Sequence, residues 1–185
     1  VLGKRIEKNI QQWRERVGDE AADKKMNKAA RRGTGLHDLT EQYLRNNPNY
    51  TAGFNASDKF LFGNFQHQLD RIDNIVALEK TLYSDYFGVA GRCDCVAEFE
   101  GKKAIIDFKT AEKTKPVEWI TNYFLQTTFY SCAMEELFGV KIPNIVIIST
   151  HEDGTCEIYQ EKRKNFIKPL METMNTYRDL LVEQA

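Results

Sequence analysis

The stretch VAGRCDCVAEFEGKKAIIDFKT, residues 89–110, contains two apolar runs joined by a Glu-Gly pair. Such runs around a two-residue turn predict a β-hairpin with strands over 89–98 and 102–110. If Glu100 and Gly101 form the turn, the numbers of facing residues sum to 201, which places Asp94 directly opposite Asp107. The hairpin therefore brings two carboxyl groups together where a strand normally buries or pairs its side chains.

The same register gives the hairpin two unlike faces. On one face every cross-strand pair is apolar: Cys93 with Phe108, Cys95 with Ile106, and Ala97 with Ala104. The face of the two acids also pairs Arg92 with Lys109, Val96 with Ile105, and Glu98 with Lys103. Carboxylates that face each other destabilise a sheet, and their burial raises a pKa or requires a cation between them. Oxygen ligands from two strands suit Mg²⁺ or Mn²⁺, but a structural cluster with Arg92 and Lys109 explains the hairpin alone equally well.

Composition limits the class of protein. The 185 residues are 42% hydrophobic and 29% charged, which is typical of one globular domain over 1–185. The net charge of −1 argues against a general polyanion binder, so any contact with nucleic acid must be regional. No apolar run approaches the roughly 18 residues of a membrane span, and the first residues lack the core of a secretory signal. Four cysteines without C-x-x-C spacing argue against a disulfide framework or an iron–sulfur cluster, and we expect an intracellular protein.

The pattern of apolar residues predicts helices on both sides of the hairpin. We expect helices over 4–47, with a break near Gly18-Asp19 and a kink or fresh start at Gly33–Gly35, over 57–73 with Ser57 as cap, over 117–138, and from about Glu161 onward. Further strands are expected over 75–84, 144–151 and 155–160. This order predicts an α/β (α+β) fold in which helices flank a central mixed sheet of about five strands.

Three groups of polar residues occur in order along the chain. Before the hairpin, the run Arg32-Gly33-Thr34-Gly35-Leu36-His37 leads into Glu41, four residues after His37 on one helical face. Within it, Gly91 precedes Asp94 by three residues, and Asp107 opens the run Asp-Phe-Lys-Thr. After it, Gln126 and Tyr130 share a helical face. Each group alone has a structural explanation, but their combination is specific.

Together these motifs resemble the PD-(D/E)xK nuclease superfamily, and within it the RecB-like exonuclease branch, with the pattern RGT-x-x-H, G-x-x-D, hydrophobic-D-x-K-T and Q-x-x-x-Y. The runs at 13–18 and 94–98 resemble the mitochondrial genome maintenance exonucleases and their phage counterparts. The resemblance covers most of the chain and implies a restriction-endonuclease-like core. Cys93 stands where the superfamily's name has proline, and the cysteines that hold an iron–sulfur cluster in some relatives are missing, which implies a member without the cluster.

Carried over residue by residue, the resemblance implies a site for Mg²⁺ or Mn²⁺ formed by Asp94, Asp107, the Phe108 carbonyl and His37. Lys109 would orient or help deprotonate the attacking water, and completes the catalytic set with Asp94, Asp107 and His37. Glu79, in the strand before the hairpin, is a further candidate with a structural alternative. The remaining motif residues would support the site and position the substrate strand: Gln126, Tyr130, Arg32 and Thr34.

The implied activity is that of a metal-dependent DNA exonuclease acting on single-stranded or end-processed DNA in replication, repair or recombination. The run 24–32 carries five cations that suit a phosphate track, or else a solvated helix face. Aromatic residues that can either stack bases or fill the core are Tyr43, Phe54, Phe60, Phe62, Phe65 and Tyr123.

Two other classes of protein compete with the nuclease. One is a catalytically inactive nucleic-acid-binding module of the same fold, against which the intact Asp94, Asp107 and Lys109 argue. The other is a zinc-binding regulatory domain, against which the absent ligand spacing argues. We expect DNA as the partner, a monomer and no membrane association. A phage-infected or bacterial cytoplasm is favoured over the mitochondrial matrix, which the sequence also allows.

Overall fold

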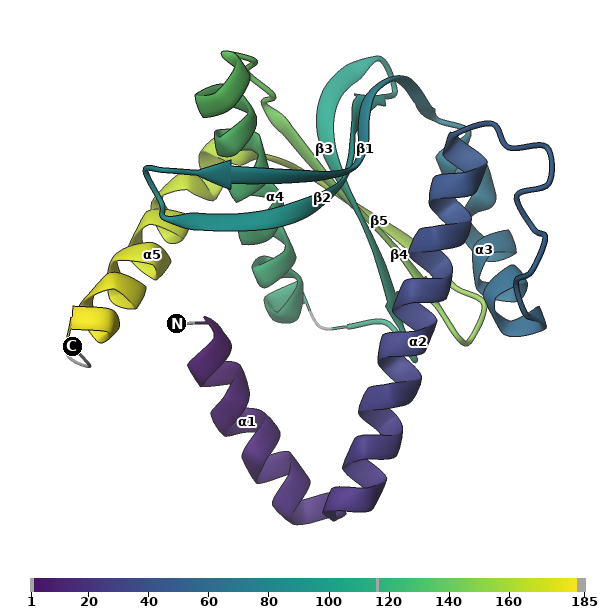
Figure 1. Cartoon of the computed structure of the whole chain (residues 1–185), viewed down its shortest axis with the longest axis horizontal. Coiled ribbons are helices and arrows are strands. Elements are labelled where there is room, and N and C mark those ends of the chain that lie inside the picture. The colour runs from purple at the N-terminus through teal and green to yellow at the C-terminus, as the bar shows by residue number, and fades with distance from the viewer. Residues whose placement is uncertain (1, 116, 183–185) are drawn as a thin grey trace.

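The computed structural model describes residues 2–115 and 117–182, and Figure 1 shows a single mixed sheet with helices on its faces. The α/β class and the five-stranded mixed sheet are confirmed. Among the described residues no helix is long and apolar enough to cross a membrane. The elements are α1 (Leu2–Val17), α2 (Asp19–Leu44), α3 (Ala56–Leu69), β1 (Ile72–Ser84), β2 (Val89–Phe99), β3 (Lys102–Ala111), α4 (Val117–Phe138), β4 (Asn144–His151), β5 (Cys156–Lys162), a 3₁₀ turn (Arg163–Asn165) and α5 (Ile167–Val182).

The sheet follows the chain in the order β1-β2-β3-β4-β5. All neighbouring strands are antiparallel except β3 and β4, which are parallel because α4 carries the chain back between them. Two apolar clusters lie on opposite faces. One packs beneath α2 and α3 and includes Leu36, Phe65 and Phe108, and the other packs beneath α4 and includes Ile105 and Phe129.

The β2–β3 hairpin has the expected turn and register over part of its length. Glu100 and Gly101 have φ values of 51° and 73°, which a two-residue hairpin turn requires. The pairs run from Phe99–Lys102 to Cys95–Ile106, each summing to 201. The ladder stops there: β2 continues with β1 alone, while β3 continues with β4, so the sheet forks (Figure 1).

At the fork β2 exchanges its faces, which corrects the predicted pairing beyond Cys95. Cys95 packs in the cluster beneath α2, whereas Cys93 and Val96 pack in the cluster beneath α4. Regular alternation would keep Cys93 and Cys95 on one face, so the strand reverses at Asp94. Glu79, which the β1–β2 register places opposite Asp94, has a left-handed φ of 49°. The expected pairs of Asp94 with Asp107, Arg92 with Lys109 and Cys93 with Phe108 therefore do not form as a regular ladder.

Some expected boundaries are wrong for local reasons. α2 continues through Gly33 and Gly35 without a fresh start, and Gly35 serves close packing, because a Cβ there would lie 2.5 Å from Asp58 Oδ1 in α3. Asn55, not Ser57, caps α3 by accepting a hydrogen bond from Asp58 N at 2.9 Å.

Two helices also end or begin elsewhere than expected. α3 ends at Leu69, because β1 begins at Ile72 and already pairs there with Phe99. The last helix begins at Ile167 rather than near Glu161, because β5 still pairs with β4 at Lys162.

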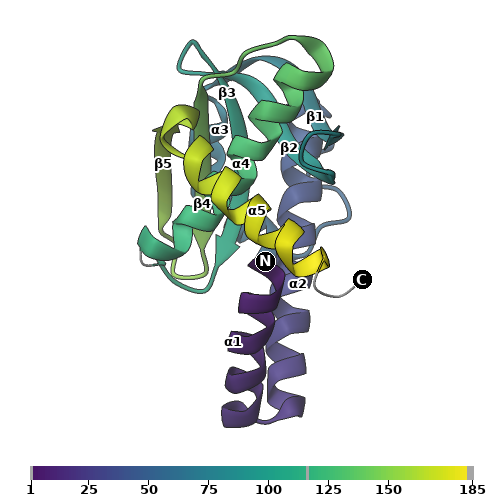
Figure 2. The ribbon, with the colours of Figure 1, turned by 90° about the vertical axis from the view of Figure 1, so that its left-hand side faces the viewer.

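α1 and the first half of α2 form a helical hairpin that projects from the sheet (Figures 1 and 2). Gly18, with φ 85°, joins the helices, which confirms the predicted break. Arg14 pairs with Asp19 at 2.9 Å and with Asp23 at 2.6 Å and so stabilises the bend. Residues 23–31 of α2 are all exposed, so this stretch of the helix is open to solvent.

Candidate active site

Asp94 lies where β2 leaves β3. The N–H of Phe108 donates to Asp94 Oδ2 at 2.8 Å. The carboxylate thus takes the place of the β2 carbonyl that would accept this hydrogen bond in a continued ladder. The N–H and C=O of one strand residue point to the same edge, so the Phe108 carbonyl also faces the gap between the strands. Both Asp94 and Phe108 are buried. The fork therefore directs a carboxylate and a carbonyl into one protected space.

Two further donor groups reach Asp94 from α2 and β1. His37 Nδ1 lies 3.7 Å from Asp94 Oδ2 and 3.3 Å from Glu79 Oε1. Ligand atoms of His37, Glu79 and Asp94 all lie within 4.8 Å of one another, a set that can hold a metal ion. Glu79 also pairs with Arg92 at 2.7 Å. The long-range partner Glu79 thus takes the place beside His37 that helical spacing offered to Glu41, which pairs with Arg45 at 2.8 Å instead.

Asp107 and Lys109 form the other side of the fork. Lys109 Nζ lies 2.6 Å from both carboxylate oxygens of Asp107 and donates a hydrogen bond to Oδ1. Oδ2 lies near the ammonium group but outside hydrogen-bond geometry, and it is buried without a hydrogen-bond partner. An unsatisfied buried oxygen is costly unless a cation binds it. An ion at Oδ2 would share this oxygen with the Lys109 ammonium group, and Asp107 lies outside the close set of His37, Glu79 and Asp94.

The electrostatics of the fork favour added positive charge. Burial, and next to it the charge of Asp107, raises the pKa of Asp94 to about 7. Burial also raises the pKa of Asp107, although Lys109 opposes the shift. Burial lowers the pKa of Lys109, but Asp107 and Asp94 outweigh it and the pKa rises.

The histidine shows the same balance. Burial lowers the pKa of His37, yet the hydrogen bond to Glu79 and the charge of Asp94 raise it overall. The pKa values of the two aspartates and of the neighbouring lysine and histidine are all raised, which indicates an excess of acidic groups at the fork. These residues fit a divalent cation.

Helix α4 forms a wall behind Asp94. Gln126 Nε2 donates to the Tyr130 hydroxyl at 3.2 Å, and both residues share the expected face. A Cβ on Gly91 would lie 2.8 Å from that hydroxyl, so only glycine lets β2 approach Tyr130 this closely. Burial raises the pKa of Tyr130, and the charges of Cys93, Asp94 and Asp107 add to the shift. The glycine before Asp94 and the glutamine–tyrosine pair therefore belong to one contact.

Tyr123 and Lys115 join this site, and sequence reasoning missed their roles. The Tyr123 ring centroid lies 5.1 Å from Lys109 Nζ and 5.1 Å from Lys115 Nζ, and Lys115 donates to the Tyr123 hydroxyl. Tyr123 had been expected only to stack bases or fill the core. Tyr123 precedes Gln126 by three residues on the same helix, and this spacing could have placed its side chain at the site. The Tyr123 ring therefore contacts the same ammonium group that Asp107 binds.

Two predicted substrate-binding residues lie apart from the metal-binding set. Arg32 is only 10% exposed and bonds within the protein, to Thr110 Oγ1 at 3.1 Å and Glu152 Oε1 at 2.6 Å. Thr34 is exposed on α2. Of the candidate stacking residues, Phe62 and Phe65 lie in the core, whereas Phe60 is exposed. The substrate-binding roles of these residues remain predictions.

The family of the chain follows from comparison with known proteins. The model of the PD-(D/E)XK nuclease superfamily matches residues 11–181. The chain belongs to this superfamily. Its members are nucleases that use divalent metal ions and act on nucleic acid, which agrees with the excess of acidic groups at the fork.

Relatives and a solved structure add detail. Mitochondrial genome maintenance exonuclease 1 of Mus musculus is 28% identical over 191 residues, covering 86% of this chain and 56% of the relative. The Homo sapiens protein of that name is 28% identical over 158 residues, covering 79% and 45%. A candidate exonuclease from Eubacterium rectale matches in structure with a TM-score of 0.53 and 10% identity, over 83% of this chain and 66% of that one, and it supports the fold alone. The chain spans about half the length of the curated relatives it matches.

Proposed function

We propose that this chain is a metal-dependent DNA exonuclease whose single nuclease domain, residues 1–185, hydrolyses phosphodiester bonds of single-stranded or end-processed DNA in replication, repair or recombination. One observation carries the proposal. Two buried carboxyl groups and a lysine meet where the sheet forks, with one Asp107 oxygen unsatisfied and the pKa of Asp94 raised to about 7. A catalytically inactive binding module has no use for this arrangement, because buried acids of this kind destabilise a fold.

Four residues would hold Mg²⁺ or Mn²⁺: Asp94, Asp107, the Phe108 carbonyl and His37. Glu79 holds His37 by its hydrogen bond and adds a carboxylate to the same set. When bound, such an ion lowers the pKa of a water molecule and neutralises charge on the scissile phosphate. Oxygen ligands with one imidazole are the donor set that Mg²⁺ and Mn²⁺ accept.

Lys109 supplies the cationic group of the reaction. Asp107 and the Tyr123 ring both contact its ammonium group, and its raised pKa keeps it protonated. It therefore orients the attacking water and stabilises the negative charge that develops on the phosphate in the transition state. In-line attack would leave a 5′-phosphate and a 3′-hydroxyl. Gln126 and Tyr130 support the β2 side of the site through Gly91.

The names of the relatives bear on substrate and location. Both are mitochondrial genome maintenance exonucleases, which supports genomic DNA as the substrate and the mitochondrial matrix as the location. They give no support to a phage-infected or bacterial cytoplasm. A preference for single strands and a monomeric state are part of the proposal.

The test uses end-labelled single-stranded DNA with Mg²⁺, Mn²⁺ or EDTA. Wild type should degrade the DNA only with a metal ion, and Asp107→Ala and Lys109→Ala should not. Asp73→Ala removes an exposed acid of β1 outside the site and should match wild type. Equal degradation by all variants would overturn the site, and binding without degradation under every ion would favour the inactive module. Resistance of circular single-stranded DNA would confirm attack from an end.

A further inference from the structure

A basic groove lies between the first half of α2 and the start of α3. Its volume is about 520 Å³, and four of its lining residues are cations: Lys24, Lys28, Arg31 and Arg32. The other charged lining residues are Asp58 and Glu152, so four positive and two negative charges leave a net charge of +2. Asn27, Asn55 and Ser57 add polar groups that bind phosphate oxygens well. The groove therefore suits a polyanion more than a neutral ligand.

The four cations fall into two pairs that differ in whether they bind an acidic side chain. Glu152 binds Lys28 at 2.9 Å and Arg32 at 2.6 Å, and these pairs fix the floor of the groove. Lys24 and Arg31 are exposed, and among the side chains that the structure describes, those of residues 10–115 and 120–179, neither has an ion-pair partner. These two free cations are available to an incoming anion.

The groove continues toward the catalytic lysine. A neighbouring cavity of about 430 Å³ shares Arg32 with the groove, and its other charged lining residues are Lys113, Lys115 and the single acid Glu112. Thr110 binds Arg32 of α2 through its hydroxyl at 3.1 Å, whereas the neighbouring Lys109 points to the opposite face of β3, toward Tyr123 of α4. Lys115 contacts the same Tyr123 ring and so links this cavity to Lys109. A path of cations thus runs from Lys115 and Lys109 at the fork to Lys24. Along α2, the 13 residues from His37 to Lys24 span about 20 Å, which is long enough for several nucleotides.

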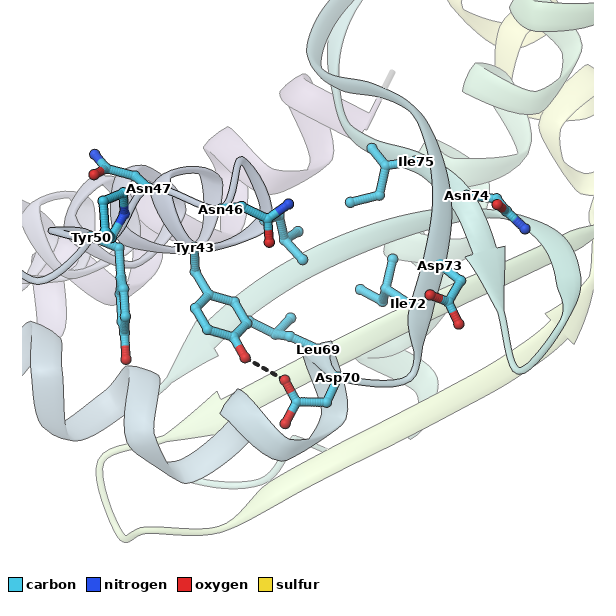
Figure 3. Close-up of a pocket in the computed structure, with 12 residues that line it drawn as sticks. Tyr43, Asn46, Asn47, Tyr50, Leu69, Asp70, Ile72, Asp73, Asn74 and Ile75 are labelled. Carbon is cyan, nitrogen blue, oxygen red and sulfur yellow. Dashed lines mark hydrogen bonds between the residues drawn. The ribbon is translucent and has the colours of Figure 1, made fainter.

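The opposite end of α2 offers no such path. A cavity of about 560 Å³ lies there, and Figure 3 shows Tyr43 directed at Asp70, with Asp73 nearby. Two acids and no Lys or Arg line it, so it repels phosphate. Charge alone therefore gives the path along α2 a direction, from the fork toward the projecting helical hairpin.

We infer that the basic groove binds the backbone phosphates of the DNA strand several nucleotides away from the scissile bond, with Lys24 and Arg31 making the contacts. The inference rests on the proposed function and names the course of its substrate. Lys28 and Arg32 shape the floor through Glu152, and the projecting part of α2 presents the free cations. The groove reads no bases, because phosphate contacts carry no sequence information.

The test compares two double variants that remove the same charge. Lys24→Gln/Arg31→Gln removes the free groove cations, whereas Lys25→Gln/Lys59→Gln removes two exposed lysines of α2 and α3 that line neither cavity. The probe is a fluorescent 12-nucleotide oligothymidylate in EDTA, titrated at several salt concentrations. Two lost phosphate contacts should reduce the slope of log Kd against log salt by about 1.4. The control variant should keep the wild-type slope.

Turnover with Mg²⁺ adds a second readout. The groove variant should hydrolyse a trinucleotide at the wild-type rate and lose about tenfold in kcat/KM on the 12-mer. Equal slopes for the two double variants, or a loss that is the same for both substrates, would overturn the groove. If wild type and the groove variant hydrolyse the 12-mer at the same rate, the proposed nuclease activity is supported and the groove is excluded as a binding site. If wild type binds with a groove-dependent slope but hydrolyses nothing under any ion, the proposed function fails instead.

Discussion

The β2–β3 hairpin has two unlike halves. The regular half runs from Cys95 through the turn to Ile106, and the forked half comprises the rest of β2 and β3. From Cys95 to the turn, β2 pairs with β3 residue by residue and buries apolar side chains on both faces. From Asp94 toward its start, β2 pairs with β1 alone, and buried carboxyl groups fill the space that the ladder leaves. Strand donors that lose a backbone partner need another acceptor, and Asp94 provides one for Phe108 N–H. The break in the ladder both requires buried acids and makes room for an ion.

Removing the forked half's charges should have the largest effect. Asp107→Asn and Lys109→Met should each lower kcat on single-stranded DNA by about 1000-fold, about 4 kcal/mol, because each removes a preorganised charge near the scissile phosphate. Single-turnover kinetics at saturating Mn²⁺ would measure the effect. Asp107→Asn also leaves the largely buried Lys109 ammonium group without its ion-pair partner, so its melting temperature should fall, and kcat is measured well below that temperature. A loss below tenfold would place the reaction elsewhere.

The regular half should respond in stability and not in chemistry. Phe99 is fully buried at the turn end of β2, and the Cζ atom of Arg71 lies 4.7 Å from the centroid of its ring. Phe99→Ala should lower the free energy of unfolding by about 3 kcal/mol through a cavity, as measured by urea denaturation. Phe60→Ala, at an exposed position, should change it by less than about 0.5 kcal/mol. The kcat of the folded fraction of Phe99→Ala should stay within twofold of wild type, and a larger fall would show that the two halves are coupled.

The sequence predicted the regular half better than the forked half, for physical reasons. The Glu-Gly turn and strict alternation determine the register of Cys95 through Ile106, so local signals suffice there. The face reversal at Asp94 depends on α2 and α4 packing against opposite faces, which spacing does not reveal. Helical spacing likewise paired His37 with Glu41, whereas tertiary packing brings it to Glu79, 42 residues away. The motif residues were found through the family resemblance, and their convergence needed coordinates.

The pH dependence of stability should separate the halves next. In the folded protein without metal, the pKa of Asp94 is about 7, against 3.8 as the ordinary value. The folded state therefore favours the protonated Asp94 carboxyl group. The contribution of this group to the free energy of unfolding is fully present below about pH 4 and is lost as the pH rises through 7. Between pH 5 and pH 8 the loss should be about 2 to 3 kcal/mol in EDTA. Urea denaturation across this range measures it.

Asp94→Asn tests the origin of that slope. The variant cannot ionise at this position, so its stability should vary much less between pH 5 and pH 8, and at pH 8 it should exceed wild type in EDTA. His37, whose pKa is also raised, contributes a loss in the same direction as it deprotonates, and Asp94→Asn weakens that shift too. A slope unchanged by Asp94→Asn would exclude the buried carboxyl group as its cause.

The smallest expected effect concerns the contact between the forked strand and α4. In Gly91→Ala the new methyl group would lie 2.8 Å from the Tyr130 hydroxyl and 3.0 Å from Cε1 of the ring. Tyr130 is buried, so the ring or β2 must shift by a few tenths of an ångström, and the shift displaces Asp94 three residues later. Because small misplacements of reacting groups are costly, we expect kcat to fall about tenfold. Gly63→Ala, where a methyl group meets open space on α3, should leave kcat unchanged.

A double variant shows whether that loss passes through Tyr130. Tyr130→Phe removes the hydroxyl that the new methyl group would meet at 2.8 Å, and it also removes the acceptor of Gln126. If the clash displaces β2, Gly91→Ala/Tyr130→Phe should lose less activity than the two single losses multiplied together, because residues in contact are coupled. Strictly multiplicative losses would mean that Gly91 acts on the fork through its own backbone, and that the α4 wall does not position Asp94.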